Sequence, residues 1–368
     1  MNKNKFKLRN ELAMAICLAG FTVFMCCCTE DNIPIEENED VTSIQLLDGW
    51  EISKFNLGFE VNSLPCDMYF INAETGFFVG YWGEIYKTTD AGSSWEKQNS
   101  GTTLRLYSVF FIDENTGFAS GRATGGCLDN DCDQGSPFLK TTDGGETWEK
   151  IFFKDYTEIS NLHFFDNLNG LAIIHTPLPS SEKCFIAKTS NGGVSWELID
   201  LNIYPTYYNK YYCFDNSIYI SGENQKIFTS KDYGNTWETI YTPLSAWDYV
   251  RNMYFYNEHI GYIDGISNIY KTVDGGVNWE TVDFPYSSIG TFHFYNEAEG
   301  FIIIVVHEYD GGDFPTYKGC IAYQTYDGGA TWENSALINS HYWNLTYFVQ
   351  SDLGYGVNLS EFFTIKRK

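Results

Sequence analysis

The chain has 368 residues, of which 48 are acidic and 23 basic, giving a formal net charge of −25 at pH 7. A charge this negative excludes nucleic acid and anionic membrane surfaces as direct partners. Hydrophobic residues make up 43% of the chain and aromatic residues 18%, which is enough for one large core, and no second domain is indicated.

Residues 1–27 have the pattern of an export signal. A basic start, MNKNKFKLRN, precedes the apolar stretch LAMAICLAGFTVFM at 12–25, which is short for a membrane span. Three cysteines follow at 26–28, and the arrangement resembles a bacterial lipoprotein signal, in which a lipidated cysteine becomes the mature N-terminus. We expect Cys28 to carry the lipid, with Cys27 as the alternative, and a cleaved secretory signal remains the other interpretation.

The next segment, 28–45, contains the acidic and apolar-poor sequence TEDNIPIEENED and predicts a disordered tether. Acidic residues directly after the lipidated cysteine resemble the surface-export signal of some Gram-negative lipoproteins. The N-terminal region therefore predicts a protein that is lipid-anchored at the outer membrane or cell surface of a Gram-negative bacterium. Its only membrane contact would be the lipid.

The folded domain is predicted to span 46–368. It opens with LDGWEIS at 47–53, which reads as a single strand with its tryptophan, and it ends with the strand EFFTIKRK at 361–368. Between them, one hairpin phrase recurs seven times, as in MYFINAETGFFVG at 68–80: an apolar run, a polar turn and a second apolar run. The last of these hairpins has only one strand after it. We expect the N-terminal strand to complete that unit and so close the fold without exposed edges.

A second phrase follows the hairpin six times, as in KTTDGGETWE at 140–149. Its Thr and Asp side chains can hydrogen-bond the nearby backbone in a tight turn, its Gly can adopt a positive φ, and its Trp can anchor the next strand in a core. The tryptophans lie 41 to 53 residues apart. Four short strands at this period predict an all-β, seven-bladed β-propeller.

The repeated carboxylates look like catalytic or calcium-binding residues, but repetition favours a structural role. Six similar turns cannot converge on one active site, and each supplies too few oxygen ligands for calcium. The turn residues are Asp90, Asp143, Asn191, Asp232, Asp274 and Asp327, and the anchors are Trp95, Trp148, Trp196, Trp237, Trp279 and Trp332. We predict no catalytic residue, metal or cofactor.

The two phrases together resemble the Asp-box, or bacterial neuraminidase repeat, propellers. The pattern is most similar to the photosystem II assembly and stability factor branch, and the resemblance covers 46–368. It implies a seven-bladed propeller whose Asp boxes are structural. That branch consists of non-enzymatic binding proteins, whereas other members are glycoside hydrolases.

Two alternatives involve chemistry. The segment DNDCDQG at 129–135 spaces three aspartates like a calcium loop, but its Gly comes one residue late and Lys140 stands where a bidentate Glu is needed, which favours a solvated acidic loop. A glycoside hydrolase, sialidase-like or endoglucanase-like, would need a pair of carboxylates about 5–9.5 Å apart. The sequence offers Asp155, Asp248, Asp310 and Asp313 for such a pair but cannot place them.

Loops of irregular length lie at the rim opposite the repeated turns and are rich in aromatic residues. Function concentrates in such loops, and aromatic and Arg side chains are enriched in binding hot spots. The predicted ligand-binding residues are Trp82, Arg105, Arg122, Trp247, Arg251 and Trp343. We expect a monomer that binds a protein or a glycan through this face and catalyses nothing, with the hydrolase as the alternative.

Overall fold

The structure is a computed structural model, and it describes residues 43–45, 49–56, 65–123, 135–153, 158–176, 183–203, 210–245, 248–266, 268–284, 289–308, 316–338, 345–357 and 361–367. Several predictions fall outside these ranges. They concern the signal 1–27, the lipidated Cys28, nearly all of the tether, the acidic loop at 129–134, and the two binding residues Trp247 and Trp343.

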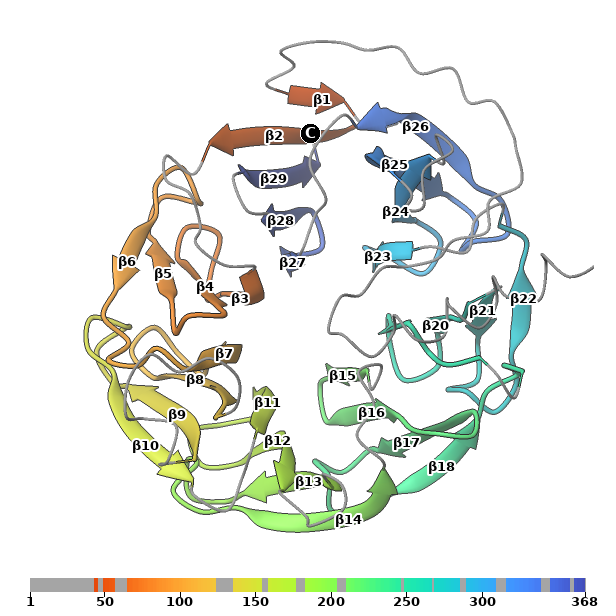
Figure 1. Cartoon of the computed structure of the whole chain (residues 1–368). Coiled ribbons are helices and arrows are strands. Elements are labelled where there is room, and N and C mark those ends of the chain that lie inside the picture. The colour runs from red at the N-terminus through yellow and green to blue at the C-terminus, as the bar shows by residue number, and fades with distance from the viewer. Residues whose placement is uncertain are drawn as a thin grey trace, which may run out of the picture.

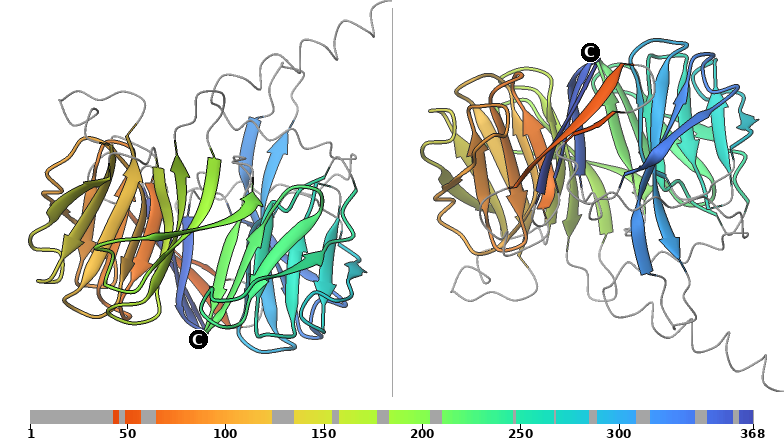
Figure 2. Two further views of the ribbon diagram at one scale, coloured as in Figure 1. Left: turned by 90° about the horizontal axis from the view of Figure 1, so that it is seen from below. Right: turned by 90° about the horizontal axis from the view of Figure 1, so that it is seen from above.

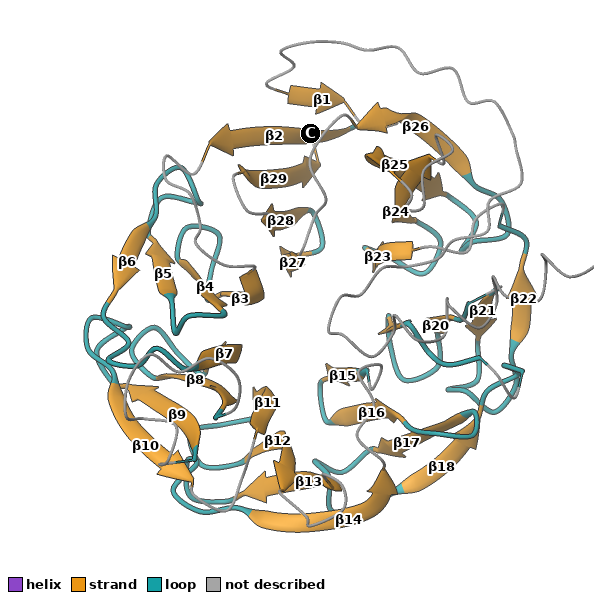
Figure 3. Ribbon diagram, in the orientation of Figure 1, coloured by secondary structure: helices purple, strands orange, loops and turns teal. Residues whose placement is uncertain are grey.

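All regular elements of the described chain are strands, and they stand as sheets around a central axis (Figures 1 and 3). The side views show the sheets side by side in a short cylinder with a rim at each end (Figure 2). The fold is therefore an all-β propeller. Within the ranges given above, no helix has the length and apolarity that a membrane crossing requires.

Four sheets contain four strands each, in chain order. The first consists of β3 (Pro65–Phe70), β4 (Gly76–Gly80), β5 (Ile85–Thr88) and β6 (Glu96–Gln98). The second consists of β15 (Tyr211–Phe214), β16 (Ser217–Ser221), β17 (Lys226–Ser230) and β18 (Glu238–Tyr241). The third consists of β19 (Asn252–Phe255), β20 (Gly261–Asp264), β21 (Ile269–Thr272) and β22 (Glu280–Val282). The fourth consists of β23 (Ile289–Phe294), β24 (Gly300–Glu308), β25 (Thr316–Thr325) and β26 (Glu333–Ile338).

Two sheets are larger. The eight-stranded sheet consists of β7 (Arg105–Phe111), β8 (Gly117–Arg122), β9 (Ser136–Thr141), β10 (Glu149–Phe153), β11 (Glu158–Phe164), β12 (Gly170–Thr176), β13 (Lys183–Thr189) and β14 (Glu197–Ile203). The five-stranded sheet has the order β1 (Ser43–Gln45), β2 (Trp50–Asn56), β29 (Glu361–Arg367), β28 (Leu353–Val357) and β27 (Leu345–Gln350).

The prediction of a seven-bladed propeller is therefore wrong, whereas the all-β propeller class is confirmed. The described strands form six sheets, of which five have the size of a blade and the sixth has eight strands. In the large sheet, β11 continues from β8 through the pair Glu158↔Arg122, where the two side chains also form an ion pair with a distance of 2.9 Å. The sequence indicates the strands and turns. It does not show that the start of β11 comes close enough to β8 for the two strands to pair.

The five-stranded sheet joins the two ends of the described chain. Strand β2 pairs with β29 over seven positions, from Trp50↔Arg367 to Asn56↔Glu361 (Figure 1). This is the pairing expected from the N-terminal strand. The sheet also begins earlier than predicted, because β1 pairs with β2 and lies inside the segment that was interpreted as tether. An N-terminal strand thus completes a sheet that the C-terminal strands leave open.

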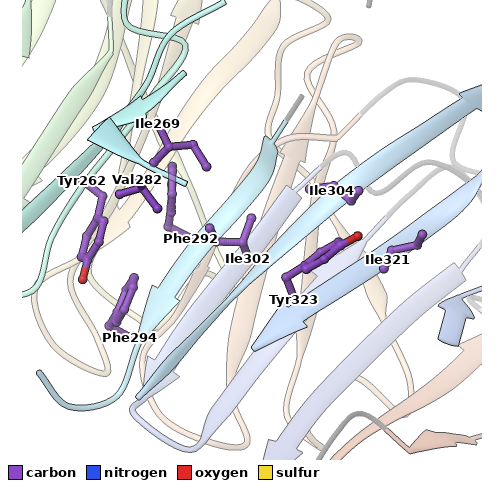
Figure 4. Packing of buried hydrophobic residues seen from close by; sticks show 9 residues of the cluster. All are labelled: Tyr262, Ile269, Val282, Phe292, Phe294, Ile302, Ile304, Ile321 and Tyr323. Carbon is purple, nitrogen blue, oxygen red and sulfur yellow. The ribbon is translucent and has the colours of Figure 1, made fainter. Parts of the chain in front are cut away.

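The core consists of apolar layers between neighbouring sheets. One layer lies between the sheet of β19–β22 and the sheet of β23–β26 and contains Tyr262, Ile269, Val282, Phe292, Phe294, Ile302, Ile304, Ile321 and Tyr323 (Figure 4). Alternation along each strand supplies these side chains, because every second residue faces the same neighbour. The six repeated tryptophans are partly buried at the edge of such layers, as Trp332 is here.

The repeated turns form the hydrogen bonds that their sequence predicts. In the copy at 140–149, Thr141 Oγ1 donates to Asp143 Oδ1 (2.8 Å) and accepts from the backbone N–H of Gly145 (2.9 Å). Asp143 in turn accepts from the backbone N–H and the hydroxyl of Thr147 (2.9 and 2.6 Å). Gly145 has a φ of 86°. These side-chain bonds lie within one short segment, and the backbone N–H of Gly144 also donates to the carbonyl of Asn115 in the preceding hairpin turn (2.8 Å), so the turn is held without a ligand.

Candidate functional site

The two rims of the propeller differ in their construction. The innermost strand of each sheet starts at one rim of the propeller, which we call the variable rim. It ends at the opposite rim, which carries the repeated turns. Residues at the start of an innermost strand or at the end of the next strand therefore lie at the variable rim. Arg105, Arg122, Glu158 and Asp264 hold such positions, and Arg251 directly precedes β19.

Arg105, Arg122 and Glu158 lie side by side at this rim. Arg105 on β7 is the cross-strand partner of Arg122 on β8, and Arg122 is in turn the partner of Glu158 on β11. Arg122 Nη1 donates to Glu158 Oε2 at 2.9 Å, and both side chains are largely buried. The ion pair neutralises Arg122, so Arg105 supplies the net positive charge of the group.

Arg105 is held by aromatic side chains. The guanidinium carbon lies 4.8 Å from the centre of the Tyr81 ring, and Nη1 donates to the Tyr107 hydroxyl at 3.4 Å. The two tyrosine rings meet edge to face with their centres 5.9 Å apart. Burial raises the pKa of both tyrosines, so they are neutral near pH 7. Among the described residues, no carboxylate lies within ion-pair distance of Arg105.

Trp82 follows Tyr81 in the same loop, and 43% of its surface is exposed. The structure therefore brings three of the predicted binding residues, Trp82, Arg105 and Arg122, to the same part of the variable rim. An exposed indole near an arginine that has no carboxylate partner within the described part of the chain is a recognition surface for an acidic group with apolar surroundings.

Arg251, in contrast, is part of the internal structure. Its Nη2 donates to both oxygens of Asp264 at 3.1 Å, and its side chain is 11% exposed while that of Asp264 is fully buried. Lys210 lies close enough to this pair to feel its charges, and burial lowers the pKa of its ammonium group. Arg251 adjoins a different sheet from that of Arg105, and the carboxylate of Asp264 largely neutralises the charge of Arg251.

Three carboxylates described at the variable rim have partners. Glu158 binds Arg122, and Asp264 binds Arg251. Asp248 Oδ1 accepts from the backbone N–H groups of Tyr249 (2.8 Å) and Ile266 (2.6 Å). A general acid and base pair is not evident among them. Asp155, Asp310 and Asp313 lie outside the described residues.

The carboxylates of the repeated turns lie at the other rim. Hydrogen bonds from Thr147, and then from Thr141, lower the pKa of Asp143 to about 2, and bonds from Thr236 do the same for Asp232. A carboxylate with so low a pKa is a poor general base near neutral pH. The geometry thus agrees with a structural role for these residues.

The innermost strands also carry a feature that the sequence analysis missed. Each has an aromatic or histidine residue three positions before the polar residue that opens its hairpin turn. We call this set the aromatic belt, and its members are Tyr69, Phe110, His163, Tyr212, Tyr254, His293 and Tyr347. Five neighbouring pairs meet with ring centres 4.8 to 6.4 Å apart, for example Tyr69 with Phe110 and Tyr254 with His293.

A cavity of about 340 Å³ lies against the belt at the centre of the ring. It is lined by Tyr212, Asn252, Met253, Tyr254, Thr291, Phe292, His293, Thr346, Tyr347 and Phe348. Asn252, Thr291 and Thr346 precede the belt residue of their strands, so the cavity lies between the belt and the variable rim. A repeated aromatic position in the hairpin phrase was the signal that could have revealed this feature.

No protein-family model and no curated protein matches the chain. Solved structures do. The chain is similar to YCF48 bound to a D1 peptide, with a TM-score of 0.64 and 19% identity over 90% of this chain and 100% of that one. YCF48 from Cyanidioschyzon merolae gives a TM-score of 0.60 and 17% identity over 86% and 99%. The GH74 enzyme of Niastella koreensis gives 0.59 and 14% over 84% and 53%. At these identities the likeness establishes the propeller fold alone, and that fold serves both binding proteins and enzymes.

Proposed function

We propose that this chain is a non-enzymatic binding propeller whose partner is a protein segment held at the variable rim. The observation that carries the proposal is Arg105, a guanidinium fixed by two tyrosines and without a carboxylate partner among the described residues. In a chain with a net charge of −25, such a group is well placed to select one acidic or carboxyl-terminal residue of a partner.

Two further points support a protein partner. Trp82 offers a large exposed apolar side chain in the loop that also carries Tyr81, and Trp, Tyr and Arg are the residues most enriched in interface hot spots. The similar structures also include a propeller that holds a peptide. A glycan remains the alternative partner, and it would use the same aromatic side chains.

Site-specific photocrosslinking tests the proposal. A benzophenone amino acid replaces Trp82 at the variable rim, or Val277 in a repeated turn at the opposite rim, where the side chain is 73% exposed. Crosslinked protein is expected from position 82 and not from position 277. Arg105→Ala is expected to reduce the yield at position 82 at least tenfold, as for loss of a hot-spot residue.

Arg367→Ala is the matched control, because Arg367 also packs over an aromatic ring, that of Tyr295, but lies at the end of the closing sheet. A yield that is equal at positions 82 and 277, or that Arg105→Ala leaves unchanged, would contradict the proposed site. Capture of a glycan-bearing molecule through its sugar would favour the glycan alternative.

We further propose that the repeated turns are Asp boxes and that the chain is a lipoprotein anchored through Cys28. The six turns support the first point through their shared hydrogen bonds, and the signal pattern of 1–28 supports the second. Replacing Cys27 and Cys28 together should release the protein from the membrane fraction. Unchanged partition of the double variant would refute the lipid anchor.

A further inference from the structure

We infer that the cavity at the centre of the ring is a binding site for a neutral ring that carries one hydroxyl, and specifically for a tyrosine side chain of the bound segment. This inference rests on the proposed function, because the segment supplies the tyrosine. It adds a second, chemically different anchor to Arg105.

The size of the cavity is suitable for such a ring. An apolar cavity of about 150 Å³ is large enough for benzene. The space of about 340 Å³ between the belt and the variable rim can therefore accept a phenol ring together with water.

The residues of the lining that the structure describes include no Asp, Glu, Lys or Arg. Its two ends differ: the belt provides aromatic rings, while Asn252, Thr291 and Thr346 provide neutral polar groups towards the variable rim. A charged group placed there would lose its hydration without gaining an opposite charge. The cavity therefore selects against the acidic group that Arg105 attracts.

The hydroxyls of the belt tyrosines are already engaged in holding neighbouring strands. Tyr212 donates to the carbonyl of Phe255 (2.8 Å) and Tyr254 to that of Phe294 (2.9 Å). Tyr347 donates to the carbonyl of Phe70 (3.4 Å). Few polar groups are left to serve a ligand, which favours a ring with one hydroxyl over a sugar with several.

His293 supplies a hydrogen-bond acceptor for that hydroxyl. Its ring is 6% exposed, stacks on Phe348 with the centres 3.5 Å apart, and places Nε2 3.1 Å from the carbonyl oxygen of Ser351. A carbonyl can only accept, so the proton lies on Nε2 and Nδ1 keeps its lone pair. Burial lowers the pKa of His293 to about 4, which keeps the ring neutral near pH 7.

Nδ1 of His293 has no hydrogen-bond partner in the described structure, and the side chain is almost completely buried. His293 also lines the cavity. A fixed acceptor at the wall of an uncharged, aromatic cavity is the counterpart of a phenol O–H group.

Saturation-transfer NMR on the purified full chain tests the inference with three probes. They are p-cresol as the tyrosine side-chain analogue, toluene as the same ring without the hydroxyl, and methyl α-glucopyranoside as a neutral sugar. We expect p-cresol to bind about fivefold more tightly than toluene, as for one net hydrogen bond, and the sugar to give no signal. Equal affinity of p-cresol and toluene, no binding of either, or binding of the sugar instead would overturn the inference.

Two histidine variants locate the contact. His293→Phe keeps a ring against Phe348 but removes the acceptor, so the preference for p-cresol over toluene should disappear. His163→Phe is the matched control, because His163 holds the same belt position on β11, is partly buried with its pKa lowered to about 4 by burial, and is not among the described residues that line the cavity. Loss of the preference in His163→Phe as well would assign the effect to the belt as a whole and contradict the inference.

Thr346→Leu covers the case in which His293→Phe does not fold. It adds apolar bulk at the cavity wall without altering a belt residue, and it should abolish binding of both p-cresol and toluene. The outcome is separate from that of the proposed function. Binding of p-cresol without a crosslink at Trp82 would overturn only the proposed function, and a crosslink without p-cresol binding would overturn only the inference of the cavity site.

Discussion

Trp50 holds the closing strand in place, and replacing it with Ala should destabilise the whole ring. Its side chain is 1% exposed and packs among Ile52, Phe301, Phe363 and other apolar residues from four separate parts of the chain. The Trp50 ring lies 5.4 Å from that of Phe301, edge to face. The residue therefore joins the closing sheet to the sheet of β23–β26.

The magnitude follows from the buried surface. A buried Trp removes about 150–250 Å² from water, and at about 25 cal/mol per Å² this corresponds to about 4–6 kcal/mol. Measured Trp→Ala changes in cores fall at about 3–5 kcal/mol, because part of the cavity collapses. We expect Trp50→Ala to lower the free energy of unfolding by about 4 kcal/mol.

Trp50→Phe is the informative companion. Nε1 of Trp50 is buried and has no hydrogen-bond partner in the described structure, so its loss removes an unsatisfied donor as well as some apolar surface. The two effects oppose each other, and we expect a change within about 1 kcal/mol. Trp237→Phe should be more costly by about 1 kcal/mol, because Nε1 of Trp237 donates to the carbonyl of Gly234 at 3.2 Å.

Equilibrium urea unfolding followed by circular dichroism measures these differences, provided that the slope with denaturant stays constant across the variants. A loss below about 1 kcal/mol for Trp50→Ala would refute the reasoning, because a fully packed tryptophan cannot be removed at so small a cost. So would a cost for Trp50→Phe as large as that for Trp50→Ala, which would show that the indole N–H and not the apolar packing stabilises the sheet.

Three further predictions concern stability. Thr141→Val should lower the free energy of unfolding by about 1–3 kcal/mol in the same assay, since it leaves the buried N–H of Gly145 without its acceptor, whereas Thr141→Ser should be nearly neutral. Burial raises the pKa of Asp67 to about 6, above its value in the unfolded chain. The contribution of Asp67 to the free energy of unfolding is thus complete below about pH 4 and is lost as the pH rises towards 6. The melting temperature of the wild type should therefore decline over this range relative to that of Asp67→Asn. Melting temperatures that change in parallel with pH in the two proteins would contradict the assignment. Deleting residues 46–54 should abolish cooperative unfolding, and a truncated chain as stable as the full one would show that β2 does not close the ring.

The sequence by itself determined the elements and their local chemistry. The repeated turns were predictable because their side-chain hydrogen bonds lie within about five residues, as between Thr141 and Gly145. The closing strand was also predictable, since Trp50 stood apart from the repeats and the last unit lacked one strand. That Arg105 and Arg122 lie at the variable rim followed from the direction of the strands alone.

Only the tertiary structure decided how these elements combine. The ladder between Arg122 and Glu158 merges strands into an eight-stranded sheet and corrects the predicted number of separate blades. Tertiary contacts also place Asp264 against Arg251 and neutralise its charge, whereas Arg105 packs against two tyrosines. The central cavity arises where four innermost strands, distant in sequence, meet around His293. In each case the outcome depends on distances between side chains of different strands, which a pattern along one strand does not contain.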